Sequence, residues 1–391
     1  MTAITCDALI VGGGVAGLFA LDALRARGLS ALLIELTALG SGQTTASQGI
    51  LHAGVKYALA GAVGDDAGEV SRAAALWKER LCEPAGDLAS VKKLANSCFL
   101  WRTAGVRGMV GMAAAAYALE SRPLPVAASD RPRWLDEVAG DVMKLPETVI
   151  DPRSLLDVLA RRHIGQLARG RVAHVMRVGE LLQIEIEARV PMTVRCRELI
   201  LAAGSGNEQL SRLAGEPLSM QRRPLRQAFV RGALPMVFGH CIDGAKTRIT
   251  VTSEQLNGGE VVWNVGGELA ERGASMDAHE FAQHARSEIE GAVRGLSLSG
   301  FEFASHLVDR AEPQTQSGRR PPRAFAHSAH GVTTLWPVKL VLAPGIADEI
   351  AEKVAGRVAG EGTAPIAWPS TIERLALADR PWQSAQWSLL S

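Results

Sequence analysis

Three features of the sequence predict an α/β fold in two interleaved domains. Residues 5–11 form a short apolar run, and a glycine-rich turn and an apolar helix pattern follow it directly. Residues 227–308 instead show a succession of strand patterns interrupted by one helix pattern. With 391 residues, the chain is long enough for two domains. Together these features predict a Rossmann-like domain and an interleaved α+β domain built on a mainly antiparallel sheet.

The glycine-rich turn has the spacing G-x-G-x-x-G, with glycines at positions 12, 14 and 17. Gly12 would permit the tight turn, Gly14 would let backbone approach a pyrophosphate, and Gly17 would let the following helix pack closely. The helix predicted at residues 18–27 would direct its N-terminus at the anion. Glu35 ends the next apolar strand, where a carboxylate accepts hydrogen bonds from ribose hydroxyls. This order of elements predicts a dinucleotide site.

The dinucleotide is predicted to be FAD rather than NAD. After Glu35 the chain enters a loop of small polar residues, 40–49, which suits close packing along an extended diphosphate and ribityl chain. The patterns at 172–178 and 181–188 predict a hairpin. Residues 196–206 then form an apolar strand that runs into small residues and glycine, so a second backbone segment could approach the cofactor.

At this point the chain resembles the D-amino-acid-oxidase-type superfamily of FAD-dependent oxidoreductases. The resemblance covers the glycine turn, the loop to Gly49, the Ile-Asp-Pro-Arg-Ser-Leu-Leu segment at 150–156, the strand ending at Ala203-Gly204, and a C-terminal apolar segment with a helix. It implies a discontinuous FAD-binding domain of residues 1–80, 150–206 and 330–391, and a substrate or cap domain of residues 81–149 and 207–329.

The resemblance and the glycine motifs together imply which residues contact FAD, and non-covalent binding is expected. The expected contacts are Gly12, Gly14, Val15, Ala16, Gly17, Glu35, Leu36, Thr44, Thr45, Ser47, Gln48, Gly49, Val175, Ala203, Gly204, Lys339 and Leu340.

The loop at residues 48–57, Gln-Gly-Ile-Leu-His-Ala-Gly-Val-Lys-Tyr, is similar to that of the hydroxyl-oxidising members, the flavin glycerol-3-phosphate and 2-hydroxyglutarate dehydrogenases. Glycerol-3-phosphate dehydrogenases normally carry Arg at the position of Lys56, and Gly-Gly-Lys-Leu-Thr where this chain has Pro-Val-Lys-Leu-Val at 337–341. The resemblance implies oxidation of the C–OH group of a small anionic substrate, glycerol 3-phosphate-like or a 2-hydroxy acid. Amine oxidation of the glycine-oxidase type and a flavoprotein without turnover remain open.

Two residues are candidates for catalysis. Removing a hydroxyl proton needs a base, and an imidazole titrates in the right range, so we expect His52 to be that base. The alternative is a histidine that holds the loop to the sheet. Lys339 would stabilise negative charge on the reduced flavin or bind the substrate anion; the alternative is a surface lysine beside Trp336.

Four further residues are candidates for holding the anionic group of the substrate: Lys56, Tyr57, Arg319 and Arg320. An ammonium meets phosphate as a point charge, and a guanidinium binds it through two hydrogen bonds. Arg319 and Arg320 are equally consistent with a basic turn that faces solvent and binds no substrate.

Other classes of function are excluded by composition. The net charge of +1 provides no field for nucleic acid or an anionic membrane, and no segment has the ~20 apolar residues of a membrane span. The five cysteines form no C-x-x-C pair, and the histidines show no metal-ligand spacing, so no disulfide framework and no metal are expected. A cytoplasmic protein is therefore expected. Quinone or dioxygen as electron acceptor and a possible homo-oligomer remain open.

Overall fold

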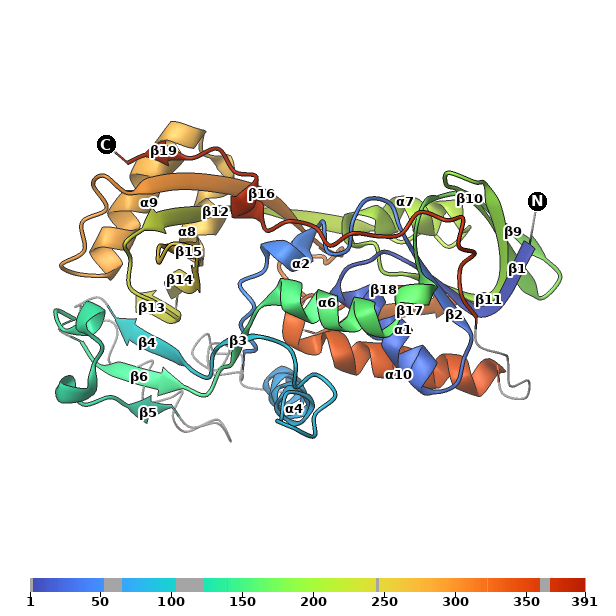
Figure 1. Cartoon of the computed structure of the whole chain (residues 1–391), viewed down its shortest axis with the longest axis horizontal. Coiled ribbons are helices and arrows are strands. Elements are labelled where there is room, and N and C mark those ends of the chain that lie inside the picture. The colour runs from blue at the N-terminus through green and yellow to red at the C-terminus, as the bar shows by residue number, and fades with distance from the viewer. Residues whose placement is uncertain are drawn as a thin grey trace. The chain divides into compact units, whose positions relative to one another are not determined.

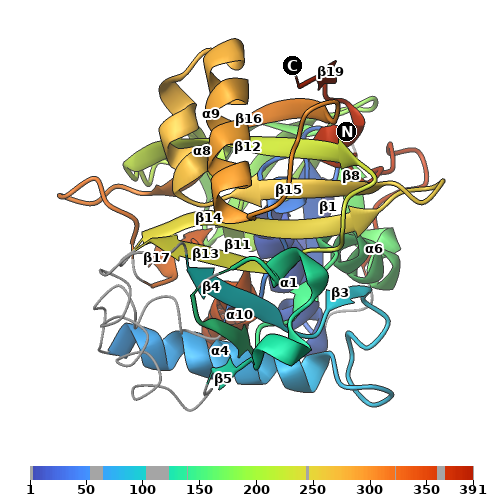
Figure 2. The same cartoon turned by 90° about the vertical axis from the view of Figure 1, so that its left-hand side faces the viewer.

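The computed structural model describes residues 3–52, 65–102, 123–138, 140–243, 246–321, 323–358 and 366–390 (Figures 1 and 2). The chain divides into two compact units. The parallel-sheet unit comprises Met1–Thr45, Pro152–Arg223 and Asp309–Asp379. The antiparallel-sheet unit comprises Ala46–Asp151, Pro224–Val308 and Arg380–Ser391. The predicted fold class is confirmed, since one unit has a largely parallel sheet between helices and the other a largely antiparallel sheet.

The parallel-sheet unit is built around β1, which is buried between two parallel neighbours. In β1 Leu9 lies opposite Leu199 of β11 on one side and Leu32 of β2 on the other. All three leucines are completely buried, as expected for the central strands of a sheet covered on both faces. The strand order is β17 (Phe325–Ala329), β18 (Val332–Trp336), β11 (Met192–Leu201), β1 (Ala3–Val11), β2 (Ala31–Glu35) and β8 (Leu167–Arg169), with the predicted hairpin β9 (Arg171–Val178) and β10 (Leu181–Glu187) joined to β11.

Helices of this unit flank the sheet. They are α1 (Val15–Ala26), α6 (Pro152–Arg162), α7 (Asn207–Leu213) and α10 (Ala343–Val358), with the short α2 (Gln43–Ala46) at the unit boundary. α1 packs beside α10 (Figure 1). α10 begins at Ala343, and Pro344 is well suited to its first turn. Among the described helices, none is long and apolar enough to cross a membrane.

The antiparallel-sheet unit contains the second large sheet and its own core. Trp101, Trp263 and Phe281 are completely buried in that core, and Trp101 Nε1 donates a hydrogen bond to the carbonyl of Ala292 at 2.8 Å. α8 (Glu268–Arg272) and α9 (Ala278–Ala292) pack on this sheet (Figure 2). The strand order is β19 (Ser388–Leu389), β16 (Glu302–Pro313), β12 (Met220–Gly232), β15 (Val261–Gly266), β14 (Lys246–Gln255), β13 (Gly239–Asp243), β4 (Cys98–Arg102), β6 (Val142–Leu145) and β5 (Leu124–Pro125).

The remaining elements of this unit are α4 (Asp65–Arg80) and a small sheet of β3 (Lys93–Ala95) and β7 (Val149–Ile150). Residues 103–122 lie outside the described residues. β4 and β6 had no counterpart in the sequence prediction.

The unit boundaries differ from the predicted domain boundaries. Residues 46–80 were predicted in the FAD-binding domain, but the antiparallel-sheet unit begins at Ala46; residues 207–223 and 309–329 fall in the parallel-sheet unit instead of the substrate domain. For residues 207–223 and 309–329 the physical reason is that the boundaries fall within β12 and β16, two long strands that have residues in both units.

The C-terminal segment also changes units, because a buried charge holds it. Residues 380–391 were predicted in the FAD-binding domain and belong to the antiparallel-sheet unit. The guanidinium of Arg380 lies 2.6 Å from Asp151 Oδ2 and 2.8 Å from Glu254 Oε2, and it is mostly buried. These two ion pairs fix the start of the segment within its unit.

An acid-sensitive contact links α1 to the end of α6. His163 Nε2 and Arg162 Nη1 each lie 2.8 Å from Asp22 Oδ1. Burial alone would raise the pKa of Asp22, but the hydrogen bonds and charges of His163 and Arg162 outweigh it and lower the pKa from 3.8 to about 2. The carboxylate therefore stabilises the fold above pH 3.8, and this stabilisation is lost as the pH falls towards 2.

We expect the free energy of unfolding of the wild type to exceed that of Asp22→Asn by about 1 to 2 kcal/mol at pH 5, allowing for partial solvent screening. The difference should shrink as the pH falls from about 4 to about 2, because the wild-type carboxylate becomes protonated there. Urea unfolding of both holoproteins at a series of pH values measures it. A difference that stays constant across this range would contradict the assignment.

Candidate functional site

The glycine turn after β1 has the geometry of a phosphate-binding loop. Gly12 has φ +115°, and a Cβ there would lie 2.5 Å from the carbonyl oxygen of Ala202. A Cβ on Gly17 would lie 1.9 Å from the carbonyl oxygen of Gly12. Gly14 is the N-cap of α1, and the first turn of that helix contains no acidic residue. The tight turn at Gly12 and the close packing at Gly17 match the predicted roles of these two glycines, and the N-terminus of α1 suits an anion.

Glu35 is held at the end of β2 by backbone donors. Its Oε2 accepts a hydrogen bond from the N–H of Gly13 at 2.7 Å, and its Oε1 accepts one from the N–H of Thr37 at 3.0 Å. A carboxylate has further lone pairs, so it can also accept hydrogen bonds from ribose hydroxyls. The adjacent Leu36 is 55% exposed and offers apolar surface beside the carboxylate.

A second tight turn follows β11 next to the glycine turn. The N–H of Ala202 donates to the carbonyl of Val11 at 2.8 Å, which joins the ends of β11 and β1. Gly204 adopts φ +55°, and the N–H of Ala203 donates to Asn207 Oδ1 at 2.7 Å. The structure thus brings the Ala203-Gly204 backbone to the edge of the sheet at which the glycine turn lies.

The loop predicted to follow the cofactor contains both anchored and unsatisfied polar groups. Thr44 Oγ1 accepts a hydrogen bond from the N–H of Val15 at 3.1 Å, and Thr45 Oγ1 donates to the carbonyl of Gly40 at 2.9 Å. Ser47 Oγ is buried and has no hydrogen-bond partner among the described residues. A buried hydroxyl left without a partner is costly, so a polar ligand group is expected beside it.

The side chain of Gln48 serves the sheet instead of the cofactor. Its Nε2 donates to the carbonyls of Thr250 and Asn264, at 2.9 and 2.8 Å. The amide N–H groups of Gln48 are thus committed to two sheet carbonyls, and the predicted contact of Gln48 with FAD falls to its other polar atoms.

The chain's residues fit FAD. The parallel-sheet unit has the glycine turn, a carboxylate at the end of the second strand and a second backbone turn beside the first. These are the groups that a dinucleotide needs for its diphosphate and ribose. In the antiparallel-sheet unit, the buried hydroxyl of Ser47, without a partner among the described residues, is by itself a group that a polar ligand would satisfy.

His52 lies in a buried group of three side chains within the antiparallel-sheet unit. Its Nδ1 is 3.4 Å from Glu147 Oε1, and His240 Nε2 is 3.1 Å from Glu147 Oε2. Glu147 is completely buried, His240 is almost so, and the His52 side chain is 21% exposed. Potential ligand atoms of the three lie within 4.8 Å of one another, the one such group among the described residues.

Backbone pairing places His52 opposite Glu147. The N–H of Ile150 donates to the carbonyl of Gly49 at 3.0 Å, and the N–H of Leu51 donates to the carbonyl of Thr148 at 2.9 Å. Gly49 has φ +71°, a conformation that favours glycine. The cofactor loop therefore continues as an extended segment antiparallel to residues 147–150.

Sequence reasoning identified His52 but missed Glu147 and His240. Glu147 lies in a Leu-Pro-Glu-Thr segment, and His240 is separated from it by 93 positions, so no spacing links them. The one local signal was a charged residue two positions before the buried pair Val149 and Ile150.

The cationic candidates of the parallel-sheet unit have different surroundings. Lys339 is buried, 8% exposed, and precedes the short helical turn Leu340–Leu342 that leads into α10. Arg320 Nη2 donates to the carbonyl of Val338 at 2.6 Å, and its buried Nε has no hydrogen-bond partner among the described residues. Val338 adopts φ +52°. Arg320 thus holds the strained turn that positions Lys339.

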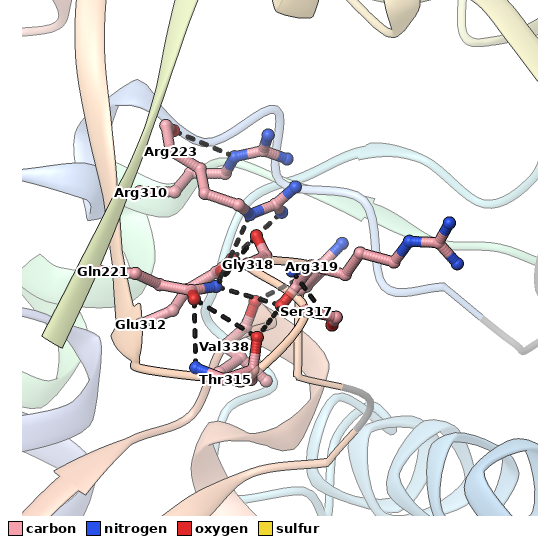
Figure 3. A network of polar contacts seen from close by, with 10 residues as sticks. Gln221, Arg223, Arg310, Glu312, Thr315, Ser317, Gly318, Arg319 and Val338 are labelled. Atoms are coloured by element: carbon pink, nitrogen blue, oxygen red, sulfur yellow. Dashed lines mark hydrogen bonds and ion pairs between the residues drawn. The ribbon is translucent and has the colours of Figure 1, made fainter.

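Arg319 belongs to an exposed loop whose backbone is fixed by its neighbours. Figure 3 shows Gln221 and Thr315 converging on this loop: Gln221 Nε2 and Thr315 Oγ1 donate to the carbonyl of Arg319 at 3.0 and 2.8 Å. Arg223 binds the buried carboxylate of Glu312 through Nε and Nη2, at 2.8 and 3.1 Å. The Arg319 residue itself is exposed.

For several of the residues expected to contact FAD or the substrate, the described structure shows no specific interaction that tests the expectation. Val15 and Ala16 are buried in the first turn of α1, Val175 is half-buried in β9, and Leu340 begins the turn after Lys339. Lys56 and Tyr57 lie outside the described residues.

The fold and the glycine-turn geometry together define a flavin-dependent oxidoreductase, and comparison with known proteins agrees. The family model of the FAD dependent oxidoreductases, DAO, matches residues 7–309. The chain is 35% identical over 356 residues to the probable FAD-dependent oxidoreductase PA4991 of Pseudomonas aeruginosa, which covers 89% of this chain and 90% of that one. The protein therefore belongs to the DAO family of FAD-dependent oxidoreductases.

Solved structures show the same fold. The crystal structure of PA4991 matches with a TM-score of 0.82 at 31% identity, over 98% of this chain and 99% of that chain. L-alpha-glycerophosphate oxidase from Mycoplasma pneumoniae matches with 0.63 at 16% identity, over 93% and 100%. Glycine oxidase from Geobacillus kaustophilus matches with 0.65 at 15% identity, over 94% and 100%. FAD as the cofactor is confirmed. L-alpha-glycerophosphate oxidase and glycine oxidase share this fold, so the fold does not distinguish C–OH oxidation from amine oxidation, and the predicted hydroxyl-oxidising branch is a proposal.

Proposed function

We propose that this flavoprotein oxidises the C–OH group of a small anionic substrate, glycerol 3-phosphate-like or a 2-hydroxy acid. The observation that carries the proposal is His52, an imidazole with Nδ1 3.4 Å from the completely buried carboxylate of Glu147. FAD, when bound, supplies the acceptor for the hydride that leaves the substrate carbon, through its N5. What the protein must add is a base for the hydroxyl proton.

His52 is suited to that task because its two ring nitrogens have different roles. With Nδ1 directed at Glu147, the substrate proton would be accepted at Nε2. A hydroxyl proton is far less acidic than an imidazolium, so it has to be removed as the carbon is oxidised. An ammonium substrate can instead lose its proton to water before oxidation. An oriented histidine therefore favours hydroxyl oxidation over amine oxidation.

Lys339 supports the anionic part of the proposal. Lys339 is 8% exposed on a turn that Arg320 holds, so the turn places a cationic side chain in a fixed position. We propose that it stabilises an anionic group, either of the substrate or of the reduced cofactor. Arg319, Lys56 and Tyr57 remain candidates for the substrate anion on sequence grounds.

An anaerobic titration tests the proposal. Glycerol 3-phosphate, lactate and 2-hydroxyglutarate are added in turn to the purified holoprotein, and glycine, sarcosine and proline serve as the amine panel. Bleaching of the visible flavin bands by at least one hydroxy substrate is the expected result. Bleaching by amines alone would overturn the proposal in favour of an amine oxidase. Bleaching by dithionite but by neither panel would overturn it in favour of a flavoprotein without this turnover.

A further inference from the structure

We infer that Glu147 and His240 are positioning residues that fix the ring orientation and the tautomer of His52. This inference rests on the proposed function in one respect, the role of His52 as the base. Nothing in the similarity to other proteins assigns either residue.

The three side chains form a continuous line with a fourth. Glu147 uses a different oxygen for each imidazole, Oε1 for His52 Nδ1 at 3.4 Å and Oε2 for His240 Nε2 at 3.1 Å. The other ring nitrogen of His240, Nδ1, lies 2.9 Å from Thr250 Oγ1. The imidazole rings of His52 and His240 are 5.5 Å apart between centroids. The line therefore runs from Thr250 through His240 and Glu147 to His52.

Rigid strands hold the far end of this line. His240 lies in β13 directly opposite Thr250 of β14, and on its other side β13 pairs with β4, where Leu100 is its partner. Thr250 is 3% exposed and His240 1%. Groups carried by neighbouring strands of one sheet keep their separation, which makes such a sheet a good support for a side chain that has to be placed accurately.

The buried carboxylate is ionised. Burial alone would raise the pKa of Glu147, but the charges and hydrogen bonds of His52 and His240 hold that pKa well below its usual range. An ionised carboxylate accepts hydrogen bonds and donates none, so each histidine must present an N–H to it. When His52 is neutral, its one ring proton therefore lies on Nδ1, and Nε2 carries the lone pair that takes the substrate proton.

His52, Glu147 and His240 are also residue types that ligate metal ions, but their arrangement is better suited to hydrogen bonding. Ligands of one ion bring their donor atoms to a common point, whereas here the two imidazoles address separate oxygens of Glu147. Metal content is accordingly one of the quantities that the test measures.

The test compares Glu147→Gln with Glu216→Gln as a matched control. Glu216 also binds a histidine, since its Oε1 lies 2.7 Å from His330 Nδ1, but that pair is on the surface of the parallel-sheet unit. We expect Glu147→Gln to slow flavin reduction about 10- to 100-fold, because the His52 ring is no longer oriented, and to change the substrate dissociation constant less than about twofold. Glu216→Gln should have the wild-type reduction rate and dissociation constant. Binding and reduction are separated by anaerobic stopped-flow at a series of substrate concentrations.

A second readout does not depend on turnover. In holoprotein with ¹⁵N-labelled histidine, the ring nitrogen signals report which nitrogen carries the proton, and a His52→Gln sample assigns the signals of His52. We expect the Nδ1–H tautomer in the wild type and a shift towards Nε2–H in Glu147→Gln. If the tautomer shifts while no hydroxy substrate reduces the flavin, the proposed function fails and the positioning role stands.

Two results would overturn the inference. The first is a Glu147→Gln protein with an unchanged His52 tautomer and unchanged reduction rate. The second is a near-stoichiometric transition metal in the purified protein that is lost in the variant. If Glu147→Gln does not retain FAD, the Thr250→Val variant tests the inference instead. It should alter the ring nitrogen signals of His240 and slow flavin reduction several-fold. A wild-type reduction rate with unaltered ring signals would overturn the inference.

Discussion

Replacing His52 with glutamine is expected to slow reduction of the flavin by a hydroxy substrate about 100-fold or more, because the base that takes the hydroxyl proton is removed. Glutamine keeps much of the side-chain volume and can still donate a hydrogen bond to Glu147, whose Oε1 lies 3.4 Å from His52 Nδ1 in the wild type. The fold and the FAD content should therefore be retained. Anaerobic stopped-flow of the flavin absorbance, with a substrate identified by titration, measures the rate.

A matched control for this variant is His174→Gln. His174 is exposed in β9 of the parallel-sheet unit, so the same chemical change there should leave the reduction rate within about twofold of the wild type. An unchanged rate in His52→Gln would remove His52 from the mechanism. A fall of similar size in both variants would indicate a general effect of the substitution.

Replacing Gly17 with alanine is expected to abolish FAD binding. The new Cβ would lie 1.9 Å from the carbonyl oxygen of Gly12, so the first turn of α1 has to move away from the end of β1. That movement displaces the backbone N–H groups that would meet the diphosphate. Overpacking of this kind costs about 3 kcal/mol or more when backbone has to shift. Flavin absorbance per protein after gel filtration and urea unfolding of the apoprotein measure the two effects.

Gly356→Ala is the control for the glycine variant. Gly356 lies within α10, and a Cβ there meets nothing within 4 Å. Alanine is the better helix former by up to about 1 kcal/mol, so this variant should retain FAD and be slightly more stable. Full FAD occupancy in Gly17→Ala would contradict the assignment of the phosphate-binding turn.

The sequence alone was sufficient to predict the glycine turn and the cofactor because their determinants are local. Gly12, Gly14 and Gly17 lie within six consecutive positions, and the strand and helix on either side have clear apolar patterns. Glu35 follows at the end of the next strand, and its carboxylate does bind the N–H of Gly13 in the turn. A motif whose parts are joined by one helix and one strand has little freedom to fold in another way.

The surroundings of His52 were decided by the tertiary structure. Glu147 and His240 come from segments far apart in the chain, and they meet because residues 49–51 pair with 148–150 while β13 lies between β4 and β14. The interleaving of the two units depends in the same way on β12 and β16, whose strand patterns carry no mark of where one unit ends. Long-range pairing of this kind depends on which strands become neighbours, and single-chain periodicity reports only that a strand exists. The sequence therefore determined the cofactor and the candidate base, and the tertiary structure determined what orients that base.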